Sequence, residues 1–149
     1  MTRRSLLDVN VLIALFDAEH VHHDVAHDWF SDHRADGWAT CPLTENGFVR
    51  LMSHPSRRRD FTPISDVMAL FRTFRASGHH EFWPDAISFG DDQLFDVSAV
   101  RSQRHLTDVY LLGLAVRHRG RLVTFDQKIP VAAVRGARKE DLVVLASAE

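Results

Sequence analysis

The sequence contains one cysteine, Cys41, and only two lysines among its 149 residues. A lone cysteine can close no internal disulfide, so the small disulfide-stabilised frameworks of secreted proteins are excluded. Glycine (7 residues) and proline (5 residues) are too scarce for a low-complexity chain, and 45% hydrophobic with 26% charged residues is typical of a globular protein. The composition excludes intrinsic disorder and predicts a single domain over residues 1-149.

Long hydrophobic runs are also missing. Arg3 and Arg4 give the N-terminus the charge of a signal peptide, but Asp8 and Asn10 interrupt the apolar stretch that follows. No run approaches the ~20 apolar residues that a membrane span requires. We therefore expect a cytoplasmic protein with no membrane partner.

Positive charge is carried almost entirely by arginine, sixteen residues in all, and the formal net charge is -2. This balance gives no overall attraction to nucleic acid, so a polyanion would have to bind to a local patch. Arg57, Arg58 and Arg59 lie between His54-Pro55 and Thr62-Pro63, in a predicted loop. They are candidate phosphate contacts, and a solvated arginine-rich surface is the alternative.

Strand-like and helix-like segments alternate along the chain. Strands are predicted to end near Asp8 and to cover 38–41, 81–83, 121–125 and 142–145, and helices to fill most of the intervals between them. Thr62 and Thr107 are predicted helix N-caps, with Pro63 in the first helical position, and one helical turn is expected within 91–97. This alternation predicts an α/β fold, a three-layer α/β/α sandwich with a central parallel sheet.

Four acidic residues occupy equivalent places in this arrangement. Asp8 and Asp126 follow strands, whereas Glu45 and Asp108 begin helices, so all four are expected at the carboxyl edge of the sheet. Each alone could be only a turn or cap residue. Together they would repel, by about 4 kcal/mol for two charges ~4 Å apart, unless a cation or proton joins them.

Carboxylate oxygens favour Mg²⁺ or Mn²⁺. Such a site needs no nucleophilic side chain, because the cation can activate a water and neutralise the leaving group. The four acids therefore suggest metal-assisted hydrolysis of a phosphodiester. Asn10 and Thr107 are candidates to orient a carboxylate or a water.

With these residues identified, the chain resembles the PIN domain family, and within it the VapC-type ribonuclease toxins of toxin–antitoxin pairs. The resemblance runs nearly end to end through five blocks in order: Leu6-Leu7-Asp8-Val9-Asn10-Val11-Leu12-Ile13, Thr44-Glu45-Asn46-Gly47-Phe48-Val49-Arg50, His80-Glu81-Phe82-Trp83-Pro84, Leu106-Thr107-Asp108-Val109-Tyr110-Leu111-Leu112 and Arg121-Leu122-Val123-Thr124-Phe125-Asp126. No single block is specific, and their order in a chain of this length carries the resemblance.

The resemblance implies that Asp8 and Asp108 bind the divalent cation, Mg²⁺ or in its place Mn²⁺, and that Glu45 and Asp126 complete a catalytic acidic quartet. It implies an endoribonuclease that leaves a 3′-hydroxyl and a 5′-phosphate. It also implies a homodimer and a cognate VapB-type antitoxin whose C-terminal arm lies across the acidic site.

Three other interpretations stay open. Asp8-Val9-Asn10-Val11 touches the opening motif of haloacid-dehalogenase-like phosphatases, but Asn10 stands where that family has its second Asp. A small α/β interaction module without catalysis is the non-enzyme alternative. The histidines from His20 to His27 could hold Zn²⁺ or Ni²⁺, because His23 and His27 share a helix face, although a histidine-rich surface helix is the simpler interpretation.

Overall fold

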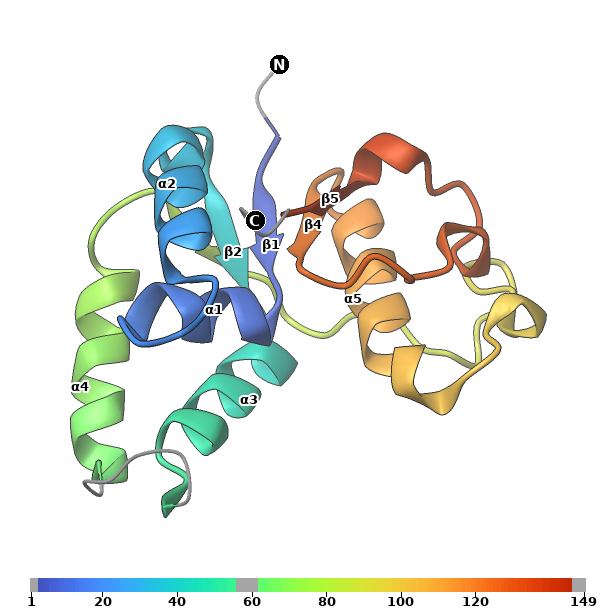
Figure 1. Cartoon of the computed structure of the whole chain (residues 1–149). Helices are drawn as coiled ribbons and strands as arrows, with labels where there is room; N and C mark the ends of the chain where they lie inside the picture. The colour runs from blue at the N-terminus through green and yellow to red at the C-terminus, as the bar shows by residue number, and fades with distance from the viewer. Residues whose placement is uncertain (1–2, 56–61, 146–149) are drawn as a thin grey trace.

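The computed structural model describes residues 3–55 and 62–145 (Figure 1). Its five strands are β1 (Ser5–Leu7), β2 (Trp38–Thr40), β3 (His80–Phe82), β4 (Arg121–Thr124) and β5 (Leu142–Val144). They form one parallel sheet in the order β3-β2-β1-β4-β5. The chain builds outward from β1 through β2 to β3 and then returns to place β4 on the other side of β1. The order of the strands therefore reverses between β1 and β4.

Five α-helices connect the strands: α1 (Val9–Phe16), α2 (His23–His33), α3 (Pro42–Met52), α4 (Ile64–Arg75) and α5 (Leu106–Arg117). Figure 1 shows α1 to α4 on one side of the sheet and α5 on the other. Successive side chains along a strand face opposite sides of the sheet. Leu7 and Val123 pack with α1–α4, whereas Leu6 and Leu122 pack with α5. The predicted three-layer α/β/α sandwich with a parallel sheet is confirmed.

The inner strands β1, β2 and β4 are buried on both faces, which explains why they are short and largely apolar. The edge strand β3 is mostly exposed and carries polar residues. Leu6, Leu7, Leu122 and Val123 are completely buried. A slip of one residue would exchange the two faces and misplace every core side chain. The core therefore fixes the register that positions the strand ends.

Two local predictions were wrong. Helix α4 begins at Ile64 with Pro63 as its N-cap, so Thr62 does not cap it. Helix α5 begins at Leu106 with His105 as its N-cap, and Thr107 lies inside the first turn. The helical turn expected within 91–97 is present, because the Phe95 amide donates to the Asp91 carbonyl over 3.1 Å. A 3₁₀ turn follows at Val97–Ala99, where the Asp96 side chain accepts a hydrogen bond from the Ser98 amide. Within the described ranges, no helix is both long and apolar enough to cross a bilayer.

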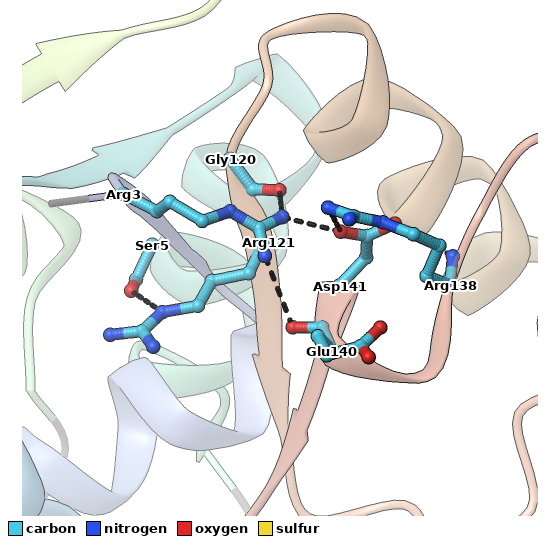
Figure 2. Close-up of polar contacts among 7 residues, drawn as sticks. All are labelled: Arg3, Ser5, Gly120, Arg121, Arg138, Glu140 and Asp141. Atoms are coloured by element: carbon cyan, nitrogen blue, oxygen red, sulfur yellow. Dashed lines mark hydrogen bonds and ion pairs between the residues drawn. The ribbon is translucent and has the colours of Figure 1, made fainter. Parts of the chain in front are cut away.

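The amino ends of β1, β4 and β5 are joined by Arg3 (Figure 2). Its guanidinium donates to the Gly120 carbonyl and, over 2.5 Å, to Asp141 Oδ1. Burial alone would raise the pKa of Asp141, but hydrogen bonds from the Arg138 amide and from Arg3 lower it below the ordinary value. Arg3 thus joins the segment before β1 to the segments that precede β4 and β5.

Gly120 in this region leaves no room for a side chain. A Cβ there would lie 2.5 Å from the Arg4 carbonyl oxygen and 2.7 Å from the ring of buried Trp83. Since neither the backbone nor a packed indole can move cheaply, we expect Gly120→Ala to lower the free energy of unfolding by about 1–3 kcal/mol, measured by urea denaturation. Gly90→Ala, on an exposed loop, is the matched control. Equal stability of the two variants would contradict this packing account.

Candidate metal centre

Asp8 connects β1 to α1 and is almost completely buried, at 7% exposure. It is the N-cap of α1, and its Oδ1 accepts a hydrogen bond from the Val9 amide over 2.7 Å. Its Oδ2 accepts one from the Thr124 hydroxyl over 2.8 Å. Burial raises the pKa of Asp8, which the hydrogen bonds from Thr124 and Val9 partly counteract and the charge of Asp126 reinforces. Both carboxylate oxygens are therefore held in fixed directions.

Asp126 reaches the same point from the end of β4. Its backbone amide donates to the Thr124 hydroxyl over 3.1 Å, and the same hydroxyl donates to Asp8. Asp126 Oδ1 accepts from the Lys128 amide over 2.8 Å. Thr124, which sequence reasoning did not single out, is thus the hydrogen-bonded bridge between the two strand-end acids.

Asp108 completes a group of three acids from the first turn of α5. Burial, the charges of Asp8 and Asp126, and a side-chain hydrogen bond with Asp126 together raise the pKa of Asp108 to about 7, with burial the largest cause. A carboxylate perturbed in this way, next to two others at the strand ends where the strand order reverses, is typical of a functional site. The structure therefore brings together three of the four predicted acids.

His105 also belongs to this group, although it was not predicted. One ligand atom from each of His105, Asp108 and Asp126 lies within 4.8 Å of the other two. His105 Nδ1 is 3.6 Å from Asp126 Oδ2. In the part of the chain that the structure describes, this buried nitrogen has no hydrogen-bond partner. The sequence carried only an indirect signal for His105, its place three residues before Asp108.

Glu45 has different partners. It lies near the start of α3, and its Oε2 accepts a hydrogen bond from the Thr40 hydroxyl over 2.6 Å. Arg75 Nη1, on α4, lies 3.6 Å from the same oxygen. The Thr40 hydroxyl also contacts His80 Nε2, 2.7 Å away. In this conformation Glu45 is engaged by Thr40 and Arg75 rather than by the other three acids.

The weaker candidates are less informative. Asn10 and Thr107 are both exposed, in the first turns of α1 and α5. Arg57, Arg58 and Arg59 lie outside the described residues. Their roles stay predictions.

The histidines between 20 and 27 form no group of metal-ligating side chains within the ranges that the structure covers. His23 Nδ1 lies 2.6 Å from the Ala14 carbonyl oxygen, and the His22 ring stacks on Phe125 at a centroid distance of 4.7 Å. The structure therefore favours a packing role for these two residues over a Zn²⁺ or Ni²⁺ site.

Comparison with known proteins agrees with this geometry. The PIN domain family model matches residues 5–135. Ribonuclease VapC44 of Mycobacterium tuberculosis is 47% identical over 144 residues, which cover 95% of this chain and 99% of that protein. Ribonuclease VapC39 of the same organism is 42% identical over 132 residues, covering 89% and 95% of the two chains. Ribonuclease VapC38 is 44% identical over 122 residues, covering 82% and 84%.

The raised pKa of Asp108 predicts how stability depends on pH. Because the folded-state pKa, about 7, lies above the ordinary value of 3.8, the folded state binds this proton more tightly than the unfolded state. Ionised Asp108 then destabilises the fold, so its contribution to the free energy of unfolding falls as pH rises from about 4 to about 7.

We therefore expect Asp108→Asn to raise the melting temperature of the metal-free protein at pH 8 by about 2–4 °C and to have a smaller effect at pH 5. The Asp108→Asn variant should also lose the stabilisation that Mn²⁺ gives the parent protein. Asp32→Asn, at an exposed acid on α2, is the control. A lower melting temperature for Asp108→Asn at pH 8 would contradict the electrostatic account.

Proposed function

The chain belongs to the PIN domain family and to its VapC ribonucleases, and on this premise we propose that it is a divalent-metal-dependent endoribonuclease, the toxin of a toxin–antitoxin pair. One observation carries the proposal: Asp8, Asp108 and Asp126 converge from three separate elements at the carboxyl ends of β1 and β4, where the strand order reverses. Family membership sets aside the phosphatase alternative.

The donor set fits a small divalent cation. Asp8 and Asp108 would hold Mg²⁺ or Mn²⁺, with Asp126 completing the group on the β4 side. When bound, the cation would make an attacking water more acidic and neutralise charge on the scissile phosphodiester. The chain's own contribution is orientation, because Thr124 and the Val9 amide fix the two oxygens of Asp8, and the Lys128 amide fixes one oxygen of Asp126.

Glu45 is proposed as the fourth catalytic acid, in keeping with the family pattern. Its position supports this, since it lies near the start of α3 at the same edge of the sheet (Figure 1). To reach the other acids, the Glu45 side chain would have to break its contacts with Thr40 and Arg75 and turn toward the metal centre. Asn10 and Thr107 remain proposed orienting residues, and Arg57, Arg58 and Arg59 proposed phosphate contacts.

The proposed partners are an RNA substrate, a VapB-type antitoxin and a second copy of the chain. Exposed apolar side chains on α4 support protein partners, because Ile64 and Leu70 are 60% and 53% exposed. Leu70 also lines a surface pocket together with Ala69, Thr73 and Phe74 of the same helix. An RNA substrate also makes the cytoplasm the expected location.

Purified antitoxin-free protein should cleave RNA when Mn²⁺ or Mg²⁺ is present and should stop when EDTA is added. We expect Asp8→Asn to reduce the cleavage rate by at least about 100-fold, since even changes to the residues that orient a metal ligand cost 10- to 100-fold. The measurement is a gel assay on a mixed pool of structured RNA.

Asp32→Asn should retain the parent rate and serves as the matched charge-neutralising control. Bound metal without cleavage of any RNA in the pool would indicate a narrow substrate. Absence of both metal binding and cleavage would favour the non-catalytic interaction module and overturn the proposal.

A further inference from the structure

Three histidines have a buried ring nitrogen that lacks a hydrogen-bond partner among the described residues: His22, His105 and His118. The rings of His22 and His118 are stacked on Phe125 and Trp83, with centroid distances of 4.7 Å and 4.3 Å. His105 differs, because its buried Nδ1 lies against the carboxylates of the metal centre. A buried polar atom without a partner costs free energy, so this nitrogen points to a ligand.

We propose that His105 supplies a nitrogen ligand to the cation in this centre and that this ligand makes the centre favour Mn²⁺ over Mg²⁺. The inference rests on the proposed function, because it concerns the same cation. It goes further by adding a residue outside the acidic quartet and by giving the site a preference between metals.

The spacing of the donors suits a shared cation. Ligand atoms at ~2.1 Å from an ion, on opposite sides of it, are ~4.2 Å apart. The donors from His105, Asp108 and Asp126 are separated by no more than 4.8 Å. Small side-chain rotations would therefore bring all three into contact with one ion. His105 precedes α5 directly, so the same helix start positions both His105 and Asp108.

The chemistry of the donors gives the preference. Mg²⁺ is bound almost entirely through oxygen and keeps several waters, whereas imidazole nitrogen suits the transition metals. Three acids alone would bind either ion through oxygen. One imidazole among them adds affinity for Mn²⁺ with little gain for Mg²⁺.

A structural ion pair between His105 and Asp126 is the alternative. Their separation of 3.6 Å is too long for a hydrogen bond, although it is within range of an ion pair if the imidazole is protonated. The His105 side chain makes no capping hydrogen bond to α5. An ion pair of this kind predicts no nitrogen in contact with the cation, and this difference can be measured.

The test is pulsed electron paramagnetic resonance on the full chain loaded with Mn²⁺. We expect a ¹⁴N coupling to the bound Mn²⁺ in the parent protein, its loss in His105→Ala and His105→Asn, and its retention in His27→Ala, which replaces an exposed histidine on α2. Isothermal titration calorimetry should show Mn²⁺ affinity falling by about 10- to 100-fold in the His105 variants, with a smaller loss for Mg²⁺. Circular dichroism checks that each variant is folded.

The outcomes separate this inference from the proposed function. Bound Mn²⁺ without a ¹⁴N coupling in the parent protein would overturn the role of His105 and leave the acidic metal centre intact. This result needs no variant, so a His105 variant that fails to fold does not prevent the test. A coupling that persists in a folded His105 variant would also overturn it. Absence of Mn²⁺ and Mg²⁺ binding in the parent would contradict the metal centre itself.

Discussion

The parallel pairing of β1 with β4 is the constraint on which the rest of the site depends. Its register places Leu7 opposite Val123, so the next residues along the two strands, Asp8 and Thr124, come side by side. One hydroxyl, that of Thr124, then contacts both Asp8 and the backbone of Asp126. Two acids that lie 118 positions apart in the chain are thereby held near one point.

The same pairing brings carboxylates close together, and the packing of the core has to outweigh their repulsion. Two unit charges ~4 Å apart near a protein surface repel by about 4 kcal/mol, a large part of the stability of a typical domain. Buried side chains on both faces of the sheet keep the strand ends in place despite this repulsion. A proton on Asp108, whose pKa is raised to about 7, offsets it in the metal-free protein, and a divalent cation offsets it more fully.

The hydrophobic periodicity and the acidic residues at strand ends and helix starts were enough to predict the layers, the parallel sheet and the three acids that converge. These features repeat along the sequence or follow from a topological rule. Thr124 was missed because nothing local distinguishes it, and His105 because its only local signal is its place three residues before Asp108. Thr124 contacts Asp8, 116 residues earlier in the sequence, because of the register between β1 and β4. The direction of the His105 side chain is set by its place at the start of α5. The cap assigned to Thr107 was wrong by two residues because a 3₁₀ turn at Gln103–His105 leads directly into α5.

Glu45 shows where a family pattern and a particular chain can differ. Its position near the start of α3 was predictable, but its direction depends on Thr40 and on Arg75. The Arg75 guanidinium, on α4, also lies 5.6 Å from the centre of the Phe82 ring. That arginine is held by stacking on the edge strand β3, so its contact with Glu45 is part of how α4 packs. The acids at β1, β4 and α5 are positioned by the centre of the sheet, whereas the fourth is held by Thr40 of β2 and Arg75 of α4. A shift of α4 would therefore remove a direct contact of Glu45, whereas the hydrogen bonds to Asp8 and Asp126 come from α1, β4 and the segment that follows β4.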